Sequence, residues 1–201
     1  MANILVAATF NPHKIREILF ILPQLPFTIK PLSRFPGAGP AEEDGATLEQ
    51  NAVKKAGAAA RFTGLWALAD DTGLEVDALG GRPGVNSARY AGKEASAGEN
   101  NARLLSELGD LPPEKRLARF VTVIALVSPS GEIKISKGSL EGRIITGTRG
   151  VNGFGYDSIF QVGAGPRTLA EYTDEEKNSV SHRAAALKAL LPELMRLFSA
   201  P

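Results

Sequence analysis

Residues 3–14 read Asn-Ile-Leu-Val-Ala-Ala-Thr-Phe-Asn-Pro-His-Lys, and this stretch decides how the fold begins. The apolar run over residues 3–8 predicts a buried strand. Asn11 is a preferred helix N-cap and Pro12 suits the first helical position, so a helix should begin here. Apolar residues continue at helical spacing at Ile15, Ile18, Leu19 and Leu22. The sequence therefore predicts a buried strand that turns directly into a helix.

Further helices and strands are expected along the rest of the chain. Thr47 and Gln50 form a capping-box pattern that opens a helix through about Phe62. Further helices are expected over residues 97–108 and from the Ser181 cap almost to the C-terminus. Strands are expected over residues 27–32, 66–69, 74–79, 119–127, 132–137, 139–146 and 158–162, with Asp70-Asp71-Thr72-Gly73 as a turn. No repeat or linker stands out, so residues 1–201 should form one mixed α/β domain.

Length, composition and charge exclude several classes of protein. The 201 residues, 43% of them apolar and 22% charged, are typical of a globular domain rather than a disordered or fibrous chain. A net charge of +1 gives no global field for a long polyanion, so no nucleic-acid partner is expected. No apolar run approaches a membrane span and no secretory signal is evident, so we expect a cytoplasmic protein without a membrane partner. The absence of Cys excludes disulfides and thiolate metal sites.

The turn from Thr9 to Lys14 is the first candidate site. A helix N-terminus presents free N–H groups and the positive end of the helix dipole, and Lys14 adds a full charge. These features suit a phosphate. A capped surface helix with a solvated lysine has the same pattern, so spacing alone leaves both interpretations open.

Two acidic segments offer ligands for Mg²⁺, which prefers one or two carboxylates together with phosphate oxygens and water. Glu42 and Glu43 lie in a loop, and Asp70 and Asp71 follow a predicted strand. If the strand stays regular through these residues, neighbouring side chains point to opposite faces, and Asp71 shares its face with two alanines whose small side chains leave space for a ligand. We therefore favour Asp71 over Asp70. Simple turn and loop roles for these acids stay open.

A helix and a glycine-rich loop supply further candidates. Asn51 and Lys55 are four residues apart and share a helix face, which could reach one phosphate or could simply be solvated. In the loop over residues 147–157, glycines allow the backbone to approach a ligand closely. Phe154 or Tyr156 could stack there on a planar base, although a hairpin loop is the alternative.

His182 and Arg183 follow the Ser181 cap, so both lie in the first helical turn, where cations oppose the helix dipole. Residues that oppose a local preference suggest a site, here for an electron-rich ligand such as a base carbonyl. Two solvated cations are the alternative. Because His13 and His182 are the only histidines, a multi-His zinc site is impossible, and no P-loop pattern occurs.

The joint order of the motifs is more specific than any one of them. In chain order they are Thr9-x-Asn-x-x-Lys14, the Glu-Glu-x-Gly-x-Thr loop that runs into Asn51-Ala-x-x-Lys55-Ala, Ala69-Asp-Asp-Thr-Gly-Leu, Leu79-Gly-Gly-x-Pro-Gly, Ser87-Ala-Arg-Tyr, Gly153-Phe-Gly-Tyr-Asp157 and Glu176-Lys-x-x-x-Ser-His-Arg183. Together they resemble the inosine triphosphate pyrophosphatase family. The resemblance runs from residue 3 to the last helix.

The resemblance implies an α/β fold of two lobes, with a long curved mixed sheet flanked by helices and a nucleotide cleft between the lobes. It also implies a homodimer. The implied activity is the Mg²⁺-dependent hydrolysis of deaminated purine nucleoside triphosphates, such as ITP, dITP and XTP, to a monophosphate and pyrophosphate, which removes them from the nucleotide pool.

The resemblance also implies roles for single residues. The triphosphate would be held by Thr9, Phe10, Asn11, Pro12, His13, Lys14 and Lys55. Asp71 would be the metal ligand and proton acceptor, with Glu43 or Glu42 as a second ligand. The nucleotide, mainly its base, would be contacted by Thr72, Phe154, Gly155, Tyr156, Asp157, Lys177, His182 and Arg183. Two positions depart from the family pattern: Phe10 stands where many relatives carry Gly, and Ser158 replaces a common Pro.

Two other functions stay open. A Maf-type nucleotide pyrophosphatase would cleave the same bond in pyrimidine or modified nucleotides, but the pair His182 and Arg183 argues against it. A nucleotide-binding module would use the same site without turnover. Asp71, Lys14 and the acidic loop argue against such a module, because binding alone requires no carboxylate that activates water.

Overall fold

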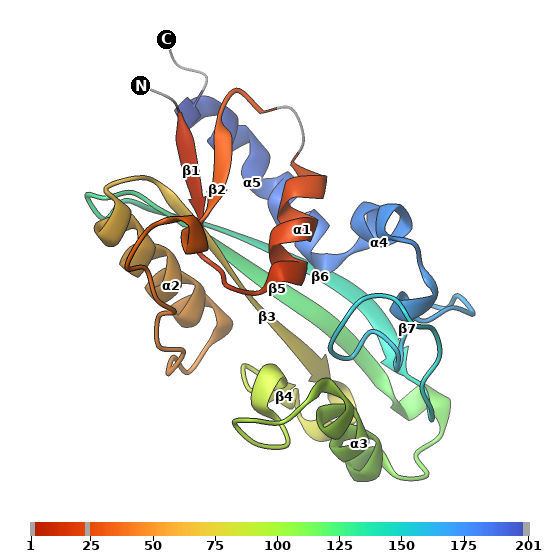
Figure 1. Ribbon diagram of the computed structural model, residues 1–201. Helices are drawn as coiled ribbons and strands as arrows, with labels where there is room; N and C mark the ends of the chain where they lie inside the picture. Colours follow the sequence, from red (N-terminus) through yellow and green to blue (C-terminus); the bar gives the residue numbers. More distant parts are fainter. Residues whose placement is uncertain (1–2, 23–24, 199–201) are drawn as a thin grey trace. The chain divides into compact units, whose positions relative to one another are not determined.

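The computed structural model describes residues 3–22 and 25–198 (Figure 1). Within these residues, seven strands form one mixed sheet in the order β2-β1-β3-β5-β6-β7, and β4 pairs with β3. The strands are β1 (Ile4–Ala7), β2 (Thr28–Pro31), β3 (Ala67–Val76), β4 (Pro83–Gly84), β5 (Leu117–Val127), β6 (Ile133–Ile144) and β7 (Phe160–Val162). The helices are α1 (Pro12–Ile21), α2 (Leu48–Thr63), α3 (Ala97–Leu108), α4 (Asp174–Val180) and α5 (His182–Phe198). The predicted α/β class, a mixed sheet flanked by helices, is confirmed.

The chain divides into two compact units. Among the described residues, the first consists of residues 3–22, 25–71, 122–138 and 183–198, and the second of Thr72–Val121 and Ser139–His182. In the first unit, β1 runs parallel to β2 and β3, and in the second, β6 and β7 are antiparallel. A single domain with a nucleotide cleft between its lobes stays a prediction. No helix in the described ranges is long and apolar enough to cross a membrane.

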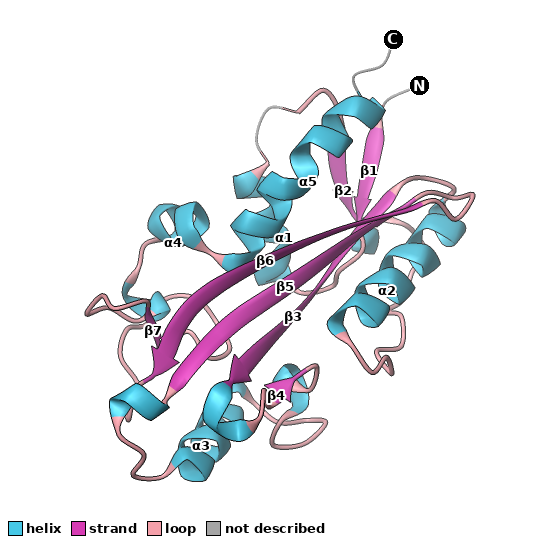
Figure 2. Ribbon diagram, turned by 180° about the vertical axis from the view of Figure 1, so that it is seen from behind, coloured by secondary structure: helices cyan, strands magenta, loops and turns pink. Residues whose placement is uncertain are grey.

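In the first unit, α1 and α5 pack on one face of the sheet (Figures 1 and 2). Their core combines Leu5 of β1 and Leu68 of β3 with Ile18 of α1 and Leu187 of α5. The opposite face is covered by α2, whose buried face includes four small side chains: Ala52, Ala56, Ala59 and Ala60. Because strand residues alternate, even-numbered residues of β3 in this unit face α1 and α5, and odd-numbered residues face α2.

The second unit has its own apolar core, which includes Leu74 of β3, Leu104 of α3, Phe120 of β5 and Phe160 of β7. Ser96 caps α3 with a reciprocal capping box to Glu99. The predicted bounds of this helix are confirmed, because its start is fixed by a local cap.

The caps of the first two helices also agree with the sequence. The Asn11 side chain accepts hydrogen bonds from the N–H groups of His13 and Lys14 at the start of α1. Thr47 accepts from the Gln50 N–H, but the Gln50 side chain accepts from the N–H of Ala46 rather than of Thr47. The reciprocal half of the predicted capping box is therefore shifted by one residue.

The structure corrects two expectations and adds one helix. The predicted turn at residues 70–73 is wrong, because β3 runs through it without interruption. Buried partners compensate both aspartates there, so tertiary contacts override the weak strand propensity of the segment. The two strands expected over residues 132–146 are the single strand β6, which continues through Gly138. The helix α4 was not predicted, although its Thr173–Glu176 capping box is visible in the sequence.

A buried ion network joins α1, β3 and α5 of the first unit. Asp70 Oδ2 lies 3.0 Å from Lys14 Nζ and accepts a hydrogen bond from Arg183 Nη2 at 2.9 Å. Arg183 Nη1 also donates to Glu17. The side chains of Asp70 and Arg183 are 0% and 1% exposed, so two cations and two carboxylates neutralise each other inside the protein.

The network lowers the pKa of Asp70. Burial alone would raise this pKa, but Lys14 and Arg183 outweigh burial and hold it far below its usual range. Burial also lowers the pKa of Lys14, and the negative charge of Asp70 only partly offsets this lowering. Because the pKa of Asp70 is lower in the folded state than in the unfolded state, its carboxylate stabilises the fold above about pH 4, and this stabilisation is lost progressively at lower pH.

We predict that Asp70→Asn lowers the free energy of unfolding at neutral pH by about 3–5 kcal/mol, because Lys14 and Arg183 lose their shared carboxylate. Urea denaturation at pH 7 and at about pH 3 measures the effect, and the variant should lose less stability on acidification than the wild type does. The control is Asp44→Asn, which changes an exposed carboxylate paired with Lys54 and should leave stability at pH 7 almost unchanged. An equal acid-induced loss in the wild type and Asp70→Asn would contradict this assignment.

Candidate functional site

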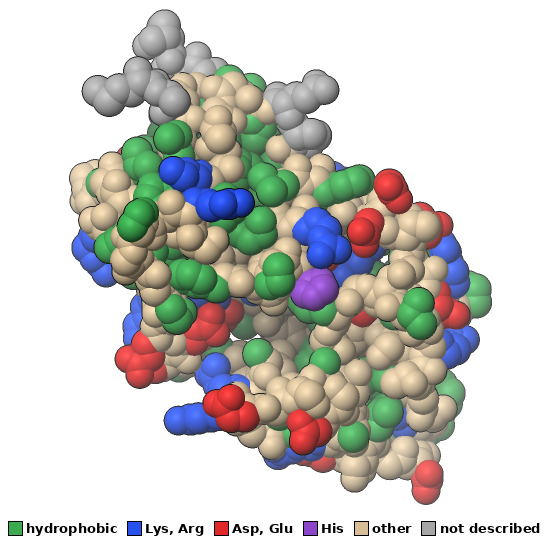
Figure 3. Space-filling view, in the orientation of Figure 1, with side chains coloured by type: hydrophobic (Ala, Val, Ile, Leu, Met, Phe, Trp, Pro, Cys, Tyr) green, Lys and Arg blue, Asp and Glu red, His purple; other side chains and the backbone are tan. Residues whose placement is uncertain are grey.

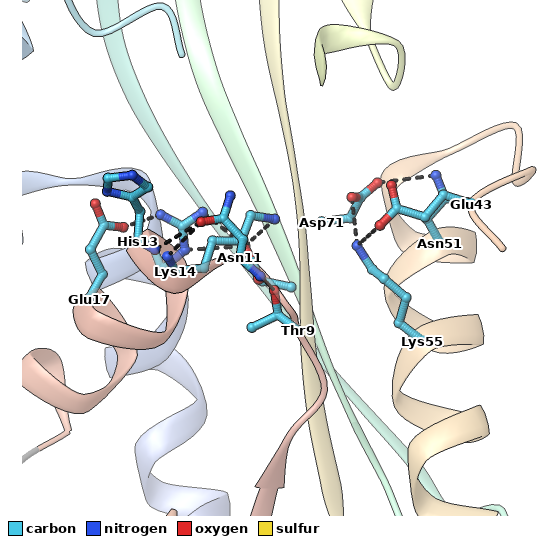
Figure 4. A network of polar contacts seen from close by, with 11 residues as sticks. Thr9, Asn11, His13, Lys14, Glu17, Glu43, Asn51, Lys55 and Asp71 are labelled. Atoms are coloured by element: carbon cyan, nitrogen blue, oxygen red, sulfur yellow. Dashed lines mark hydrogen bonds and ion pairs between the residues drawn. The ribbon is translucent and has the colours of Figure 1, made fainter. Parts of the chain in front are cut away.

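Lys55 of α2 holds two carboxylates that come from separate segments (Figure 4). Its Nζ lies 2.8 Å from Glu43 Oε1 and 2.9 Å from Asp71 Oδ1. Asp71 belongs to β3 and faces α2, as its odd number requires, whereas Glu43 lies in the loop before α2. The ammonium group of Lys55 therefore marks a position at which both carboxylates reach the same cation.

The charges of this cluster do not balance. One lysine against two carboxylates leaves one net negative charge. Burial would lower the pKa of Lys55, but Asp71, Asp70 and Glu43 outweigh it and raise the pKa, so the lysine is cationic at neutral pH. The Glu43 side chain is 39% exposed, so the cluster is open to solvent on that side. It is suited to a further cation.

The donor set fits a hard divalent metal. Mg²⁺ is commonly bound by one or two carboxylates, with substrate phosphate oxygens and water completing the shell. Asp71 and Glu43 supply two carboxylates that already converge on one cation. Glu42 is exposed in the same loop, and it is Glu43 that reaches Lys55. In the described parts of the chain, no three His, Cys, Asp or Glu side chains gather closely enough to hold a metal by themselves.

Asn51 lies beside the two carboxylates. Its Nδ2 donates to Asp71 Oδ2 at 3.2 Å, and its Oδ1 accepts from the Gly45 N–H at 2.8 Å. The side chain is fully buried. The sequence placed Asn51 and Lys55 on one helix face, which the structure bears out. The Asn51 amide, however, forms both of these hydrogen bonds within the protein, one with Asp71 and one with the acidic loop.

The turn from Thr9 to Lys14 differs from expectation in its backbone. The N–H groups of His13 and Lys14 donate to Asn11 Oδ1 at 2.9 and 3.3 Å, and the Asn11 N–H donates to Thr9 Oγ1 at 3.2 Å. Pro12 has no N–H. These three N–H groups, which belong to the turn that the sequence assigned to a phosphate, therefore have acceptors within the turn.

Lys14 is the charged side chain of this turn. It is 15% exposed, and its Nζ is paired with Asp70. Lys55 and Asp71 both act on the pKa of Lys14, the former lowering and the latter raising it. The turn and the Lys55 cluster, both in the first unit, are therefore within electrostatic reach of each other (Figure 4).

The second unit holds a preformed group around Phe154. Lys177 Nζ lies 2.6 Å from Asp157 Oδ2 and 4.7 Å from the centroid of the Phe154 ring. The Phe154 N–H donates to the same Asp157 oxygen at 2.9 Å. Lys177 and Asp157 are buried, whereas Phe154 and the neighbouring Gly155 are partly exposed. The ring is the part of this group that a planar ligand could reach.

Three residues that were predicted to contact the base are buried inside the protein. Tyr156 is a core residue whose hydroxyl donates to the carbonyl of Ser87, so Phe154 is the better candidate for stacking. His182 is buried, and its ring stacks on Phe120 at 4.7 Å. Arg183 is fully buried and donates to Asp70 and Glu17. Carboxylates compensate its unfavourable position in the first turn of α5, which the sequence alone could not show.

The remaining predicted site residues differ in exposure. Phe10 and His13 are exposed and Thr72 is half-buried. Glu17 was missed, although it lies three residues after Lys14, a spacing that places both side chains on one helix face. That spacing was a signal in the sequence for the buried network.

Lys and Arg side chains are interspersed with Asp and Glu on the face drawn in Figure 3. The described residues form no broad basic patch on this face. The pattern is in line with the net charge of +1, and the absence of a nucleic-acid partner stays a prediction.

The chain matches the family model described as the Ham1 family over residues 5–193. It is 54% identical over 190 residues to a dITP/XTP pyrophosphatase of Geobacter sulfurreducens, and the alignment covers 94% of this chain and 96% of that protein. It is also 49% identical over 194 residues to a dITP/XTP pyrophosphatase of Desulforamulus reducens, with 96% of each chain covered.

Solved structures give the same result. The HAM1 protein from Coxiella burnetii has a TM-score of 0.87 and 42% sequence identity, over 98% of this chain and 100% of that chain. The Staphylococcus aureus Ham1 protein has a TM-score of 0.85 and 40% identity, over 96% and 99% of the two chains. The resemblance found in the motifs is confirmed over nearly the whole length, and the chain belongs to the Ham1 family.

Proposed function

We propose that the protein hydrolyses deaminated purine nucleoside triphosphates, such as dITP, ITP and XTP, to the nucleoside monophosphate and pyrophosphate, with Mg²⁺ as cofactor. The observation that supports this most directly is the position of Lys55 Nζ, which joins the carboxylates of Glu43 and Asp71. The names of relatives with 54% and 49% identity support the choice of substrate.

Asp71 and Glu43 would hold the metal. A triphosphate brings several negative charges to a cluster that is already net negative, and Lys14 and Lys55 are both paired with carboxylates. The lysines alone therefore do not offset the charge of the substrate. When bound, Mg²⁺ supplies the missing positive charge and polarises a phosphate oxygen.

The reaction requires positioning and charge neutralisation, as in phosphoryl transfer generally. A water oxygen attacks the α-phosphorus, and the bond from this phosphorus to the oxygen that bridges to the β-phosphate breaks. Asp71 accepts a proton from the water. Lys55 and Lys14 neutralise charge on the pyrophosphate leaving group. All three side chains belong to the first unit.

Base selectivity is assigned to the group around Phe154 in the second unit. Hypoxanthine and xanthine carry a carbonyl acceptor at position 6, whereas adenine carries an amino donor. The Phe154 ring offers a stacking surface, and Lys177 places a donor against that ring. Adenine offers no acceptor at position 6 for a further N–H of Lys177, so this hydrogen bond is lost. The carbonyl of guanine is the same as that of hypoxanthine, so GTP must be rejected through its 2-amino group.

One assay tests the proposal: pyrophosphate release from dITP, ITP, XTP, GTP, ATP and dUTP, with Mg²⁺ and with a chelator. We expect release from the first three, and its loss with the chelator. No release from any nucleotide would favour a binding module. Strong turnover of dUTP without turnover of ITP would favour another class of pyrophosphatase. A homodimeric assembly and a cytoplasmic location stay predictions.

Asp71→Asn should lower kcat for dITP by about 10²–10⁴-fold, because the amide keeps the size of the side chain but accepts no proton. Pyrophosphate release measures the loss, and circular dichroism shows whether the variant is folded. The matched control is Asp44→Asn in the exposed part of the acidic loop, which should retain activity. A kcat near that of the wild type in folded Asp71→Asn would remove Asp71 from the mechanism.

Glu43→Gln and Glu42→Gln form a second matched pair. Because Glu43 and not Glu42 reaches Lys55, we expect Glu43→Gln to raise the Mg²⁺ concentration for half-maximal dITP hydrolysis by about 10-fold or more. Glu42→Gln should leave this concentration close to that of the wild type. The reverse order would assign the metal to Glu42 instead.

A further inference from the structure

We infer that Asn51 is a positioning residue that fixes the acidic loop and Asp71 relative to each other, and this inference rests on the proposed function. Asn51 is 0% exposed. Its Oδ1 accepts from the Gly45 N–H at 2.8 Å, and its Nδ2 donates to Asp71 Oδ2 at 3.2 Å. One planar amide thus links the loop that carries Glu43 to strand β3.

The loop side of this link depends on a glycine. A Cβ atom on Gly45 would lie 2.6 Å from Asn51 Oδ1 and 2.9 Å from Gln50 Cβ, so a larger residue cannot approach α2 as closely. Gly45 is two residues from Glu43. Fixing Gly45 therefore restricts where the carboxylate of Glu43 can lie.

The strand side of the link concerns the second carboxylate. The two oxygens of Asp71 have different partners: Oδ1 lies 2.9 Å from Lys55 Nζ, and Oδ2 accepts from Asn51. With both oxygens held, the carboxylate has little freedom to rotate. Groups that orient metal ligands in this way commonly affect metal affinity or activity by about 10–100-fold when they are replaced.

Gln50 provides the comparison. It precedes Asn51 on α2, and its Oε1 accepts from the Ala46 N–H at 2.8 Å, next to the Gly45 contact. In the part of the chain that the structure describes, Gln50 contributes no hydrogen bond to β3. Gln50→Leu therefore loosens the loop without breaking the link to Asp71, whereas Asn51→Leu breaks both contacts.

The test uses the full chain with Asn51→Leu, Gly45→Ala, Gln50→Leu and the double variant Gly45→Ala/Asn51→Leu. Mn²⁺ alone serves as the probe of metal binding, followed by electron paramagnetic resonance. The Mg²⁺ concentration for half-maximal dITP hydrolysis is the second readout, and the KM for dITP at saturating Mg²⁺ is the third. Thermal denaturation shows whether each variant is folded.

We expect Asn51→Leu to raise both the Mn²⁺ dissociation constant and the Mg²⁺ requirement by about 10–100-fold. The KM for dITP at saturating Mg²⁺ should change much less. Gly45→Ala should act in the same direction, because it displaces the acceptor Oδ1. The double variant should resemble Asn51→Leu, since both changes act on one contact, and Gln50→Leu should stay within about 2-fold of the wild type.

If Asn51→Leu does not fold, Gly45→Ala decides the matter. Unchanged Mn²⁺ binding and an unchanged Mg²⁺ requirement in folded Gly45→Ala would overturn the role of Asn51. Continued dITP hydrolysis by this variant would leave the proposed function intact. An effect of Gln50→Leu as large as that of Asn51→Leu would assign the role to the loop alone and also overturn the inference. A wild type that neither binds Mn²⁺ nor hydrolyses dITP overturns the proposed function and the inference together.

Discussion

Two adjacent aspartates in the middle of β3 constrain the first unit. A strand turns consecutive side chains to opposite faces, so Asp70 and Asp71 need counter-charges from opposite sides of the sheet. Lys14 of α1 and Arg183 of α5 compensate Asp70, and Lys55 of α2 compensates Asp71. A buried charge without a partner costs several kcal/mol. The packing of three helices is thereby tied to two consecutive residues.

The two faces of β3 differ in the balance of their charges and in their exposure to solvent. On one face, Lys14 and Arg183 match Asp70 and Glu17, and the carboxylate of Asp70 is 0% exposed. This neutral, enclosed arrangement is suited to stabilising the fold. On the other face, Lys55 meets two carboxylates, and Glu43 is 39% exposed. The net negative charge and the access to solvent suit the binding of a cation.

Two glycines allow close packing in the two candidate groups, one around Lys55 and the other around Phe154. A Cβ on Gly45 would collide with the amide of Asn51, which orients Asp71. In the second unit, a Cβ on Gly153 would lie 2.1 Å from Asp157 Oδ2. This oxygen accepts hydrogen bonds from Lys177 Nζ and from the Phe154 N–H. These two glycines are therefore explained by side chains that pack against the backbone.

The sequence by itself determined the features that depend on neighbouring residues. These include the caps at Asn11 and Thr47 and the helix over residues 97–108, because a cap involves only a few positions. Tertiary structure alone decided the continuity of β3 and the burial of Tyr156, His182 and Arg183. Asp70 and Arg183 are 113 positions apart, and no local pattern shows that their charges will meet. Burial and charge compensation are properties of the packed chain. Arg183, which the sequence suggested as a contact for a ligand, is therefore part of the interior.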